Sequence, residues 1–395
     1  MQAKATSIER AITVQFAHRI YFTRSAFSRA NQLLQRLVAP TTTDHPAKAF
    51  VAIDQGVARA YPHLTADVTA YFSQETFPAR LVCPPLIVAG GEAAKNDRGL
   101  VDLLYREIER NGICRHSYII GIGGGALLDL VGFAAATVHR GVRHLRMPTT
   151  TLSQADGGVG VKNGINAFNK KNYIGTFAPP FAVINDSDFL LQLPPVEKRA
   201  GWIEGVKVAL VRDAAFFGEI EQLAERLAAS ETTAMERVIQ RCAELHVAHI
   251  AESGDPFEFG SARPLDFGHW AAHKLEEMSD FTLSHSAAVG LGLALDTLYS
   301  HKKQMLSGES TERVLSLVQK LGFSLFHPLV KKTGPGGNWA LFDGLEEFRE
   351  HLGGGLTVTL LEKIGRGVEV HEMDAALLRE CILELEQRSG RPPAI

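Results

Sequence analysis

The chain of 395 residues has little cysteine and no excess of positive charge. Its four cysteines are scattered and form no CxxC pair: Cys83, Cys114, Cys242 and Cys381. Neither a thiolate zinc site nor a disulfide framework is therefore indicated, and we expect a reducing, cytoplasmic location. The formal net charge is -3. Without surplus lysine and arginine to neutralise phosphates along a backbone, a general nucleic-acid-binding function is disfavoured.

Uninterrupted hydrophobic runs are also scarce. Residues 1–22 carry charges where a secretory signal needs an unbroken apolar core, so we expect them to be part of the fold. Residues 118–138 are the most apolar stretch and are about long enough to span a bilayer. However, the three glycines from Gly123 to Gly125 and the charged Asp129 suit a buried strand, a turn and a helix better. No membrane partner is expected.

The first half of the chain does contain a regular alternation of strands and helices. Short apolar runs predict strands at 48–54, 84–90 and 117–125, whereas helical periodicity covers 95–112 and resumes from about Ala126. Repeated units of this kind imply a Rossmann-like α/β domain with a mainly parallel sheet. Ligands of such sheets bind at the carboxyl ends of the strands.

The second half has a different pattern of secondary structure. From about Leu193, helical segments separated by breakers such as SGDP and GPGG follow one another, with little strand pattern until residues 353–365. A chain of this length suggests two cores. We predict an α/β domain over residues 1–192 and a mostly α-helical domain over residues 193–395.

Two glycine-rich segments are candidates for ligand binding. GIGGGALLD (121–129) resembles a nucleotide-binding turn, in which the backbone approaches a pyrophosphate at a helix N-terminus, but it is not a strict GxGxxG motif. A tight turn that needs a positive φ explains these glycines equally well. Residues 148–175 gather many different polar groups between two apolar strands, which is unusual for a mere connection.

Three histidines lie close together in the second half. His269 and His273 are four residues apart, so on a helix they share one face, whereas His285 follows a polar break. Spacing alone favours His269 and His273 as partners on a metal ion. Helical histidines are, however, more often partly buried or solvated than metal-bound.

Four segments together resemble one known family. GGGALLDLVGFAAATVHRGV, PTTTLSQADGGVGVKNGIN, IEGVK, and DFGHWAAHKLE followed by His285 are similar, in this order, to signature segments of 3-dehydroquinate synthase and the related sugar phosphate cyclases. The strongest similarity spans residues 88–290.

This resemblance implies NAD in the first domain and a divalent zinc or cobalt ion in the second. The metal ligands would be Glu204, His269 and His285, with His273 beside the substrate, in place of the pair that spacing favours. The implied NAD contacts are Asp54, Glu92, Lys95, Gly124, Gly125, Asp129, Thr149, Thr150, Asp156, Lys162 and Lys171.

The implied reaction begins with a transient oxidation of a sugar phosphate by NAD. Phosphate elimination, reduction by the same NADH and an intramolecular aldol closure follow. Lys207 lies three residues after Glu204 on one helical face, so its ammonium can meet substrate oxygens. The other implied substrate contacts are Lys162, Asn172, Arg140, His273 and Asp156. In the family, the position of Arg140 reaches a neighbouring subunit's site, so we expect a homodimer.

The chain departs from dehydroquinate synthase where that enzyme grips a substrate carboxylate. The arginine expected seven residues before the first metal histidine is Ala262, with Arg263 one residue later, and the expected asparagine is Asp266. A carboxylate there would repel an anionic substrate. His246 replaces an expected lysine, and His285-Ser286-Ala287 replaces the usual HGE sequence.

These departures indicate a substrate with a neutral head group, as in the cyclases that act on sedoheptulose 7-phosphate. His273 instead resembles dehydroquinate synthase, because valiolone synthases carry proline at that position. Arg349 or His351 replaces the usual paired lysines near the C-terminus. The alternatives are a 3-dehydroquinate synthase whose carboxylate clamp uses Arg263, an iron-type alcohol dehydrogenase, and a fold retained only for binding.

Overall fold

A parallel sheet forms the centre of the first half of the chain. The structure, a computed structural model, describes residues 7–38, 46–168, 170–252, 266–334, 337–351 and 355–389. Six strands lie in the order β1-β9-β6-β5-β2-β3, β4 pairs with the end of β2, and every pairing is parallel. The strands are β1 (Ile20–Thr23), β2 (Ala47–Asp54), β3 (Ala79–Leu81), β4 (Leu86–Val88), β5 (Tyr118–Gly123), β6 (Arg143–Pro148) and β9 (Ala182–Asp186).

Helices cover both faces of this sheet, which confirms the predicted Rossmann-like α/β architecture. One apolar cluster joins the sheet to α1 (Leu33–Leu37), α2 (Gln55–Ala60) and α3 (Leu64–Phe72). A second cluster joins the other face to α4 (Arg98–Arg110) and α5 (Gly125–Thr137). The helix expected from residue 95 begins only at Arg98. Asp97 caps it by accepting a 2.8 Å hydrogen bond from the Gly99 amide, and a short turn, η1 (Glu92–Asn96), precedes it.

The polar segment after β6 folds into a turn and a hairpin that the sequence analysis did not predict. It contains η3 (Ser153–Gly157) and the antiparallel strands β7 (Lys162–Ala167) and β8 (Lys170–Phe177). β7 packs against α5, whereas β8 is largely exposed. No clear alternation of apolar residues marks these strands, because buried positions of β7 include the amide side chain of Asn163.

One buried arginine organises the backbone that leads into this hairpin. The Arg146 guanidinium, on β6, donates hydrogen bonds to the carbonyl oxygens of Gly158, Gly160 and Lys162 and to Oδ1 of Asn163, at 2.7–3.1 Å. Burial lowers the pKa of Arg146 to about 10, so the side chain stays charged. The fixed fork of a guanidinium suits such a set of acceptors.

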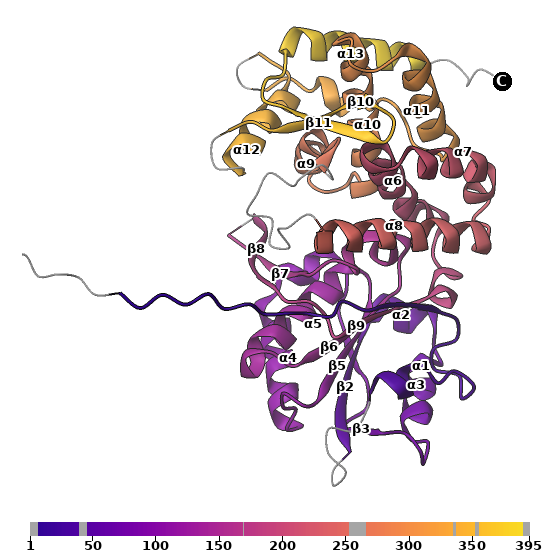
Figure 1. The fold of residues 1–395 in the computed structure, drawn as a ribbon, viewed down its shortest axis with the longest axis vertical. Helices are drawn as coiled ribbons and strands as arrows, with labels where there is room; N and C mark the ends of the chain where they lie inside the picture. The colour runs from indigo at the N-terminus through magenta and orange to yellow at the C-terminus, as the bar shows by residue number, and fades with distance from the viewer. Residues whose placement is uncertain are drawn as a thin grey trace, which may run out of the picture.

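The second half is a helical body at the other end of the molecule (Figure 1). Its longer helices are α6 (Pro195–Arg212), α7 (Ala214–Ala228), α8 (Thr232–Glu252), α9 (His269–Met278), α10 (His285–Lys302), α11 (Gly308–Lys320), α12 (Asp343–His351) and α13 (Ala375–Ser389). The strand pattern expected at 353–365 appears as β10 (Val358–Lys363), paired with β11 (Arg366–Val370). One apolar core containing Trp202 and Trp270 holds these elements together. This helix-rich half confirms the predicted fold class. Among the described helices, none has the length and apolarity to cross a membrane.

Candidate metal and nucleotide site

Three side chains from three helices converge in the helical half. One ligand atom each of Glu204 (α6), His269 (α9) and His285 (α10) lies within 4.8 Å of the others. Glu204 Oε1 is 3.5 Å from His285 Nε2 and 3.9 Å from His269 Nε2. Atoms bound to one tetrahedral zinc ion are separated by about 3.3 Å, given metal–ligand bonds of about 2.0–2.1 Å. The cluster therefore has nearly the spacing of a ligand set.

The second nitrogen of each histidine has a partner that orients the ring. His269 Nδ1 donates to the carbonyl oxygen of Phe267 at 3.1 Å, and His285 Nδ1 donates to Glu276 Oε2 at 3.0 Å. Both Nε2 atoms then face Glu204. Glu204 is buried, and neither carboxylate oxygen has a well-formed hydrogen bond, although Lys207 Nζ lies 2.5 Å from Oε2. Such a carboxylate with two imidazoles fits a zinc-type ion with open positions.

His273 does not belong to this compact group. Its ring centroid lies 5.5 Å from that of His269 and 6.2 Å from that of His285, and its side chain is exposed. The shared helical face that spacing indicated is real, and the His269 ring centroid lies 5.5 Å from that of His273 and also 5.5 Å from that of His285. Among the described residues, however, the ligand atoms that gather within 4.8 Å of one another are those of Glu204, His269 and His285. The reason is tertiary: the segment between α9 and α10 turns the chain back.

The charges of this cluster shift the pKa values of its members. Burial raises the pKa of Glu204, but the charge of Lys207 and the nearby histidines outweigh it and hold the pKa well below its usual range. Burial and Lys207 lower the pKa of His269 to about 3. Burial lowers the pKa of His285, but Glu204 and Glu276 raise it more, to about 9.

A cavity of about 270 Å³ opens beside the cluster. It is lined by Asp129, Asp156, Gly157, Gly160, Val161, Lys162, Asn172, Lys207, His246, His249, Ile250, Asp266 and His269. The two halves of the chain both contribute to its wall, with β7, β8 and η3 on one side and α6, α8 and α9 on the other. Seven of the predicted site residues are therefore gathered around one space.

Asp156 and His246 form a close pair in this wall. His246 Nδ1, on α8, contacts Asp156 Oδ1, on η3. Burial raises the pKa of Asp156, but His246 and Lys207 outweigh it and lower the pKa to about 2. The histidine that replaces an expected lysine thus lies directly against a carboxylate of the cavity wall.

The predicted nucleotide contacts lie at the carboxyl ends of neighbouring strands. Asp54 ends β2, Gly124 and Gly125 follow β5, and Thr149 and Thr150 follow β6. Thr149 donates its amide to the Gly123 carbonyl at 3.0 Å, which holds the ends of β5 and β6 together. A Cβ at Gly125 would meet nothing within 4 Å, so the helix start is open to a ligand.

The other predicted nucleotide contacts form a chain of polar interactions beside these strand ends. Lys95 Nζ lies 2.7 Å from Asp129 Oδ2 and also contacts Asn172 Oδ1, and Asn166 donates to Glu92 Oε1 at 3.0 Å. Lys171 Nζ lies 3.1 Å from Glu276 Oε1, in the other half of the chain.

Several predicted residues lie away from this cavity or cannot be placed. Arg140 is exposed after α5, in a left-handed backbone conformation with φ of 63°, and does not line the cavity. Arg349 pairs with Glu346 at 2.9 Å. Ala262, Arg263 and the side chain of His351 lie outside the described residues.

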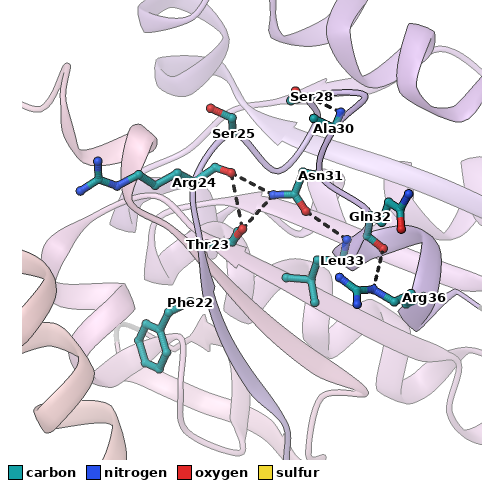
Figure 2. A pocket seen from close by; sticks show the side chains of 10 residues that line it. All are labelled: Phe22, Thr23, Arg24, Ser25, Ser28, Ala30, Asn31, Gln32, Leu33 and Arg36. Atoms are coloured by element: carbon teal, nitrogen blue, oxygen red, sulfur yellow. Dashed lines mark hydrogen bonds between the residues drawn. The ribbon is translucent and has the colours of Figure 1, made fainter.

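A second, more open hollow of about 530 Å³ lies between β1 and α1 and includes Arg24 and Arg36 (Figure 2). It contains none of the predicted site residues. Arg24 is already held by Glu236 through two 2.8 Å hydrogen bonds. The cavity beside Glu204 is therefore the one that combines the predicted chemistry.

Two known protein-family domains match the sequence of this chain. Residues 85–200 match the family described as 3-dehydroquinate synthase N-terminal, and residues 201–334 match 3-dehydroquinate synthase C-terminal. The chain belongs to the 3-dehydroquinate synthase family. The resemblance found in the sequence is thereby confirmed at the level of this family and its related cyclases.

Relatives within the 3-dehydroquinate synthase family carry more than one name. The 3-dehydroquinate synthase of Nitrosospira multiformis is 36% identical over 305 residues, 77% of this chain and 81% of that protein. The 2-epi-5-epi-valiolone synthase of Streptomyces glaucescens is 35% identical over 219 residues, 55% of this chain and 56% of that protein. Among solved structures, the 2-epi-5-epi-valiolone synthase ValA of Streptomyces hygroscopicus subsp. jinggangensis 5008, with NAD+ and Zn2+ bound, superposes with a TM-score of 0.84. It is 25% identical and covers 96% of this chain and 100% of its own.

Two residues that contact or support the candidate site escaped the sequence analysis. Glu276 contacts the candidate ligand His285, and its position seven residues after His269 places it on the same face of α9. That spacing was a usable signal. Arg146 is one of two arginines in the short strand β6, and nothing in the sequence distinguished it.

Proposed function

We propose that this enzyme is an NAD- and metal-dependent sugar phosphate cyclase that converts sedoheptulose 7-phosphate into a valiolone-type cyclitol with release of phosphate. In this proposal Glu204, His269 and His285 hold zinc or cobalt, and NAD binds at the carboxyl ends of β2, β5 and β6. The metal supplies a Lewis acid that acidifies a substrate hydroxyl, and NAD supplies a reversible hydride acceptor. The protein acts as a homodimer in the cytoplasm, with Arg140 directed to the neighbouring subunit's site.

The observation that carries the substrate choice is Asp266. Its carboxylate lines the cavity beside His269, at the position where dehydroquinate synthase has an asparagine near the substrate carboxylate. A second carboxylate at that place would repel an acid substrate, whereas a hydroxymethyl group can donate a hydrogen bond to it. Likeness to ValA over nearly the whole chain supports the same choice.

The remaining cavity residues have distinct tasks in this proposal. Lys207 contacts the substrate oxygens nearest to Glu204, while Lys162 and Asn172, from the β7–β8 hairpin, donate to the phosphate. Asp156, from η3, and His246, from α8, form a pair between the two sides of the cavity and are assigned to a proton that leaves or joins the ring.

A direct assay tests this proposal. Purified protein with NAD and Zn²⁺ or Co²⁺ is incubated with sedoheptulose 7-phosphate or with the seven-carbon acid phosphate of dehydroquinate synthase, and phosphate release is followed. We expect release from sedoheptulose 7-phosphate, no net NADH, and a relative gain for the acid substrate in Asp266→Asn. A matched control is Asp280→Asn, at an exposed turn after α9.

Each alternative has its own signature in that assay. Release of phosphate from the acid substrate alone favours 3-dehydroquinate synthase. The similarity to two 3-dehydroquinate synthases supports this alternative. Accumulation of NADH in proportion to product indicates a dehydrogenase. Binding of a sugar phosphate without turnover indicates a retained scaffold.

Metal uptake should also depend on pH. His285 has a pKa of about 9 without metal, whereas His269 is already neutral and Glu204 already ionised near neutral pH. A bound ion must therefore displace one proton, so the affinity should rise about tenfold per pH unit between about pH 6 and about pH 8. Zn²⁺ titration against a chelating dye at several pH values measures this slope, and a pH-independent affinity would contradict it.

A further inference from the structure

A second carboxylate stands behind the candidate ligand His285. Glu276, on α9, accepts a 3.0 Å hydrogen bond from His285 Nδ1, and only 6% of its side chain is exposed. A carboxylate only accepts, so Nδ1 carries the hydrogen and Nε2 faces Glu204 Oε1, 3.5 Å away. Rotation of the His285 ring would break this bond and leave one buried oxygen of Glu276 without its hydrogen-bond donor.

The other oxygen of Glu276 is held from the opposite half of the chain. Lys171, on β8, places its Nζ 3.1 Å from Glu276 Oε1 and 4.8 Å from the ring centroid of Phe281. Both oxygens of Glu276 are thus engaged, one by α10 and one by the hairpin. Through this contact the β7–β8 hairpin of the α/β half reaches a residue that holds a candidate ligand of the helical half.

The same hairpin also contacts the candidate nucleotide residues. Asn172, next to Lys171, contacts Lys95, and Asn166 of β7 donates to Glu92. The hairpin therefore connects two groups of candidate residues that lie on different halves of the chain.

We propose that Glu276 is the positioning residue for His285 and that Lys171 holds Glu276 in place, so that the β7–β8 hairpin completes the metal centre. This inference rests on the proposed function, because it requires an ion at Glu204, His269 and His285. A carboxylate behind a metal-bound imidazole fixes the ring and makes its free nitrogen a stronger ligand. Lys171 acts one step further away and has the smaller effect.

Metal affinity measured without NAD tests the inference. Zn²⁺ binding to metal-free protein is determined by competition with a chromophoric chelator, and Co²⁺ binding by its visible absorption spectrum. We expect Glu276→Gln to bind either ion about 10- to 100-fold more weakly, with an altered cobalt spectrum. Lys171→Met should shift both readouts in the same direction by less.

Neighbouring residues supply matched controls. Glu277→Gln makes the same change one residue along α9, at an exposed carboxylate that pairs with Lys274. Lys170→Met makes the same change one residue before Lys171, at an exposed position of β8. Both control variants should bind metal as the unmodified protein does.

The outcomes separate this inference from the proposed function. If the unmodified protein binds one metal ion per chain but Glu276→Gln matches its affinity and spectrum, the positioning role is wrong and the proposed metal site survives. If the unmodified protein binds no ion at this site, both fail. Should Glu276→Gln not fold, as judged by circular dichroism, Lys171→Met decides, and an unchanged affinity in that variant overturns the inference.

Discussion

Replacing Glu204 with glutamine is expected to lower the rate of phosphate release at least about 1,000-fold, because a site deprived of its anionic ligand loses several kcal/mol of electrostatic stabilisation. Glu204 is the only carboxylate in the compact cluster of ligand atoms found among the described residues. Glutamine keeps the size of the side chain and removes its charge. The loss should appear together with a loss of bound metal, measured by elemental analysis of the purified variant.

A second substitution separates metal binding from folding. Glu204→Gln leaves the buried ammonium of Lys207 without its nearest carboxylate, which itself costs stability. Glu204→Asp keeps that charge but withdraws the ligand atom by one methylene, so it should fold, bind metal more weakly and retain little activity. Glu197→Gln, on the exposed first turn of α6, is the control. Folded Gln and Asp variants with unchanged turnover would exclude Glu204 from the metal site.

Much of the α/β half could be predicted from the sequence because its signals are local. The apolar run before Gly123 predicted β5, and the helix after it followed from periodicity. β2 was predicted to within one residue of its observed start at Ala47. Parallel strands buried on both faces appear as continuous apolar runs, and each connecting helix has its own period.

The hairpin β7–β8 could not be predicted in this way. Its buried side chains are mixed: Asn163 meets the guanidinium of Arg146, whereas Ile165 joins the apolar cluster around α5, so a clear alternation of apolar and polar residues is absent. The density of polar groups marked the segment as functional but did not indicate its conformation. The composition of the segment thus predicted a functional role, but the order of its residues did not predict a hairpin.

The ligand cluster shows where local spacing reaches its limit. The i+4 rule correctly placed His269 and His273 on one face of α9, but it carries no information about which other helices approach that face. Glu204 arrives from α6 and His285 from the start of α10. Only the family resemblance selected these two residues in advance, since their proximity depends on how α6, α9 and α10 pack in the helical core.

Replacing Lys207 with methionine is expected to reduce turnover about 100- to 1,000-fold while leaving metal affinity within a few-fold, since removal of one preorganised charge at developing negative charge has that cost. Lys207 is 4% exposed and lines the cavity, and its pKa is raised because Glu204 and Asp156 outweigh the effect of burial. It therefore stays charged near neutral pH. Steady-state phosphate release and Zn²⁺ titration of the same preparation measure the two quantities.

The separation of those two readouts is what distinguishes a substrate contact from a structural ion pair. If Lys207 served only to neutralise Glu204, Lys207→Met would leave the negative charge of Glu204 uncompensated. Metal binding would then become tighter, and turnover would not fall. If it contacts substrate oxygens, turnover falls although metal remains bound. Lys198→Met, near the beginning of the same helix, bears on neither effect, because its ammonium donates to the Leu191 carbonyl at the junction of the two halves. A fall in both affinity and turnover to the level of Glu204→Gln would instead mean that Lys207 is needed to assemble the site.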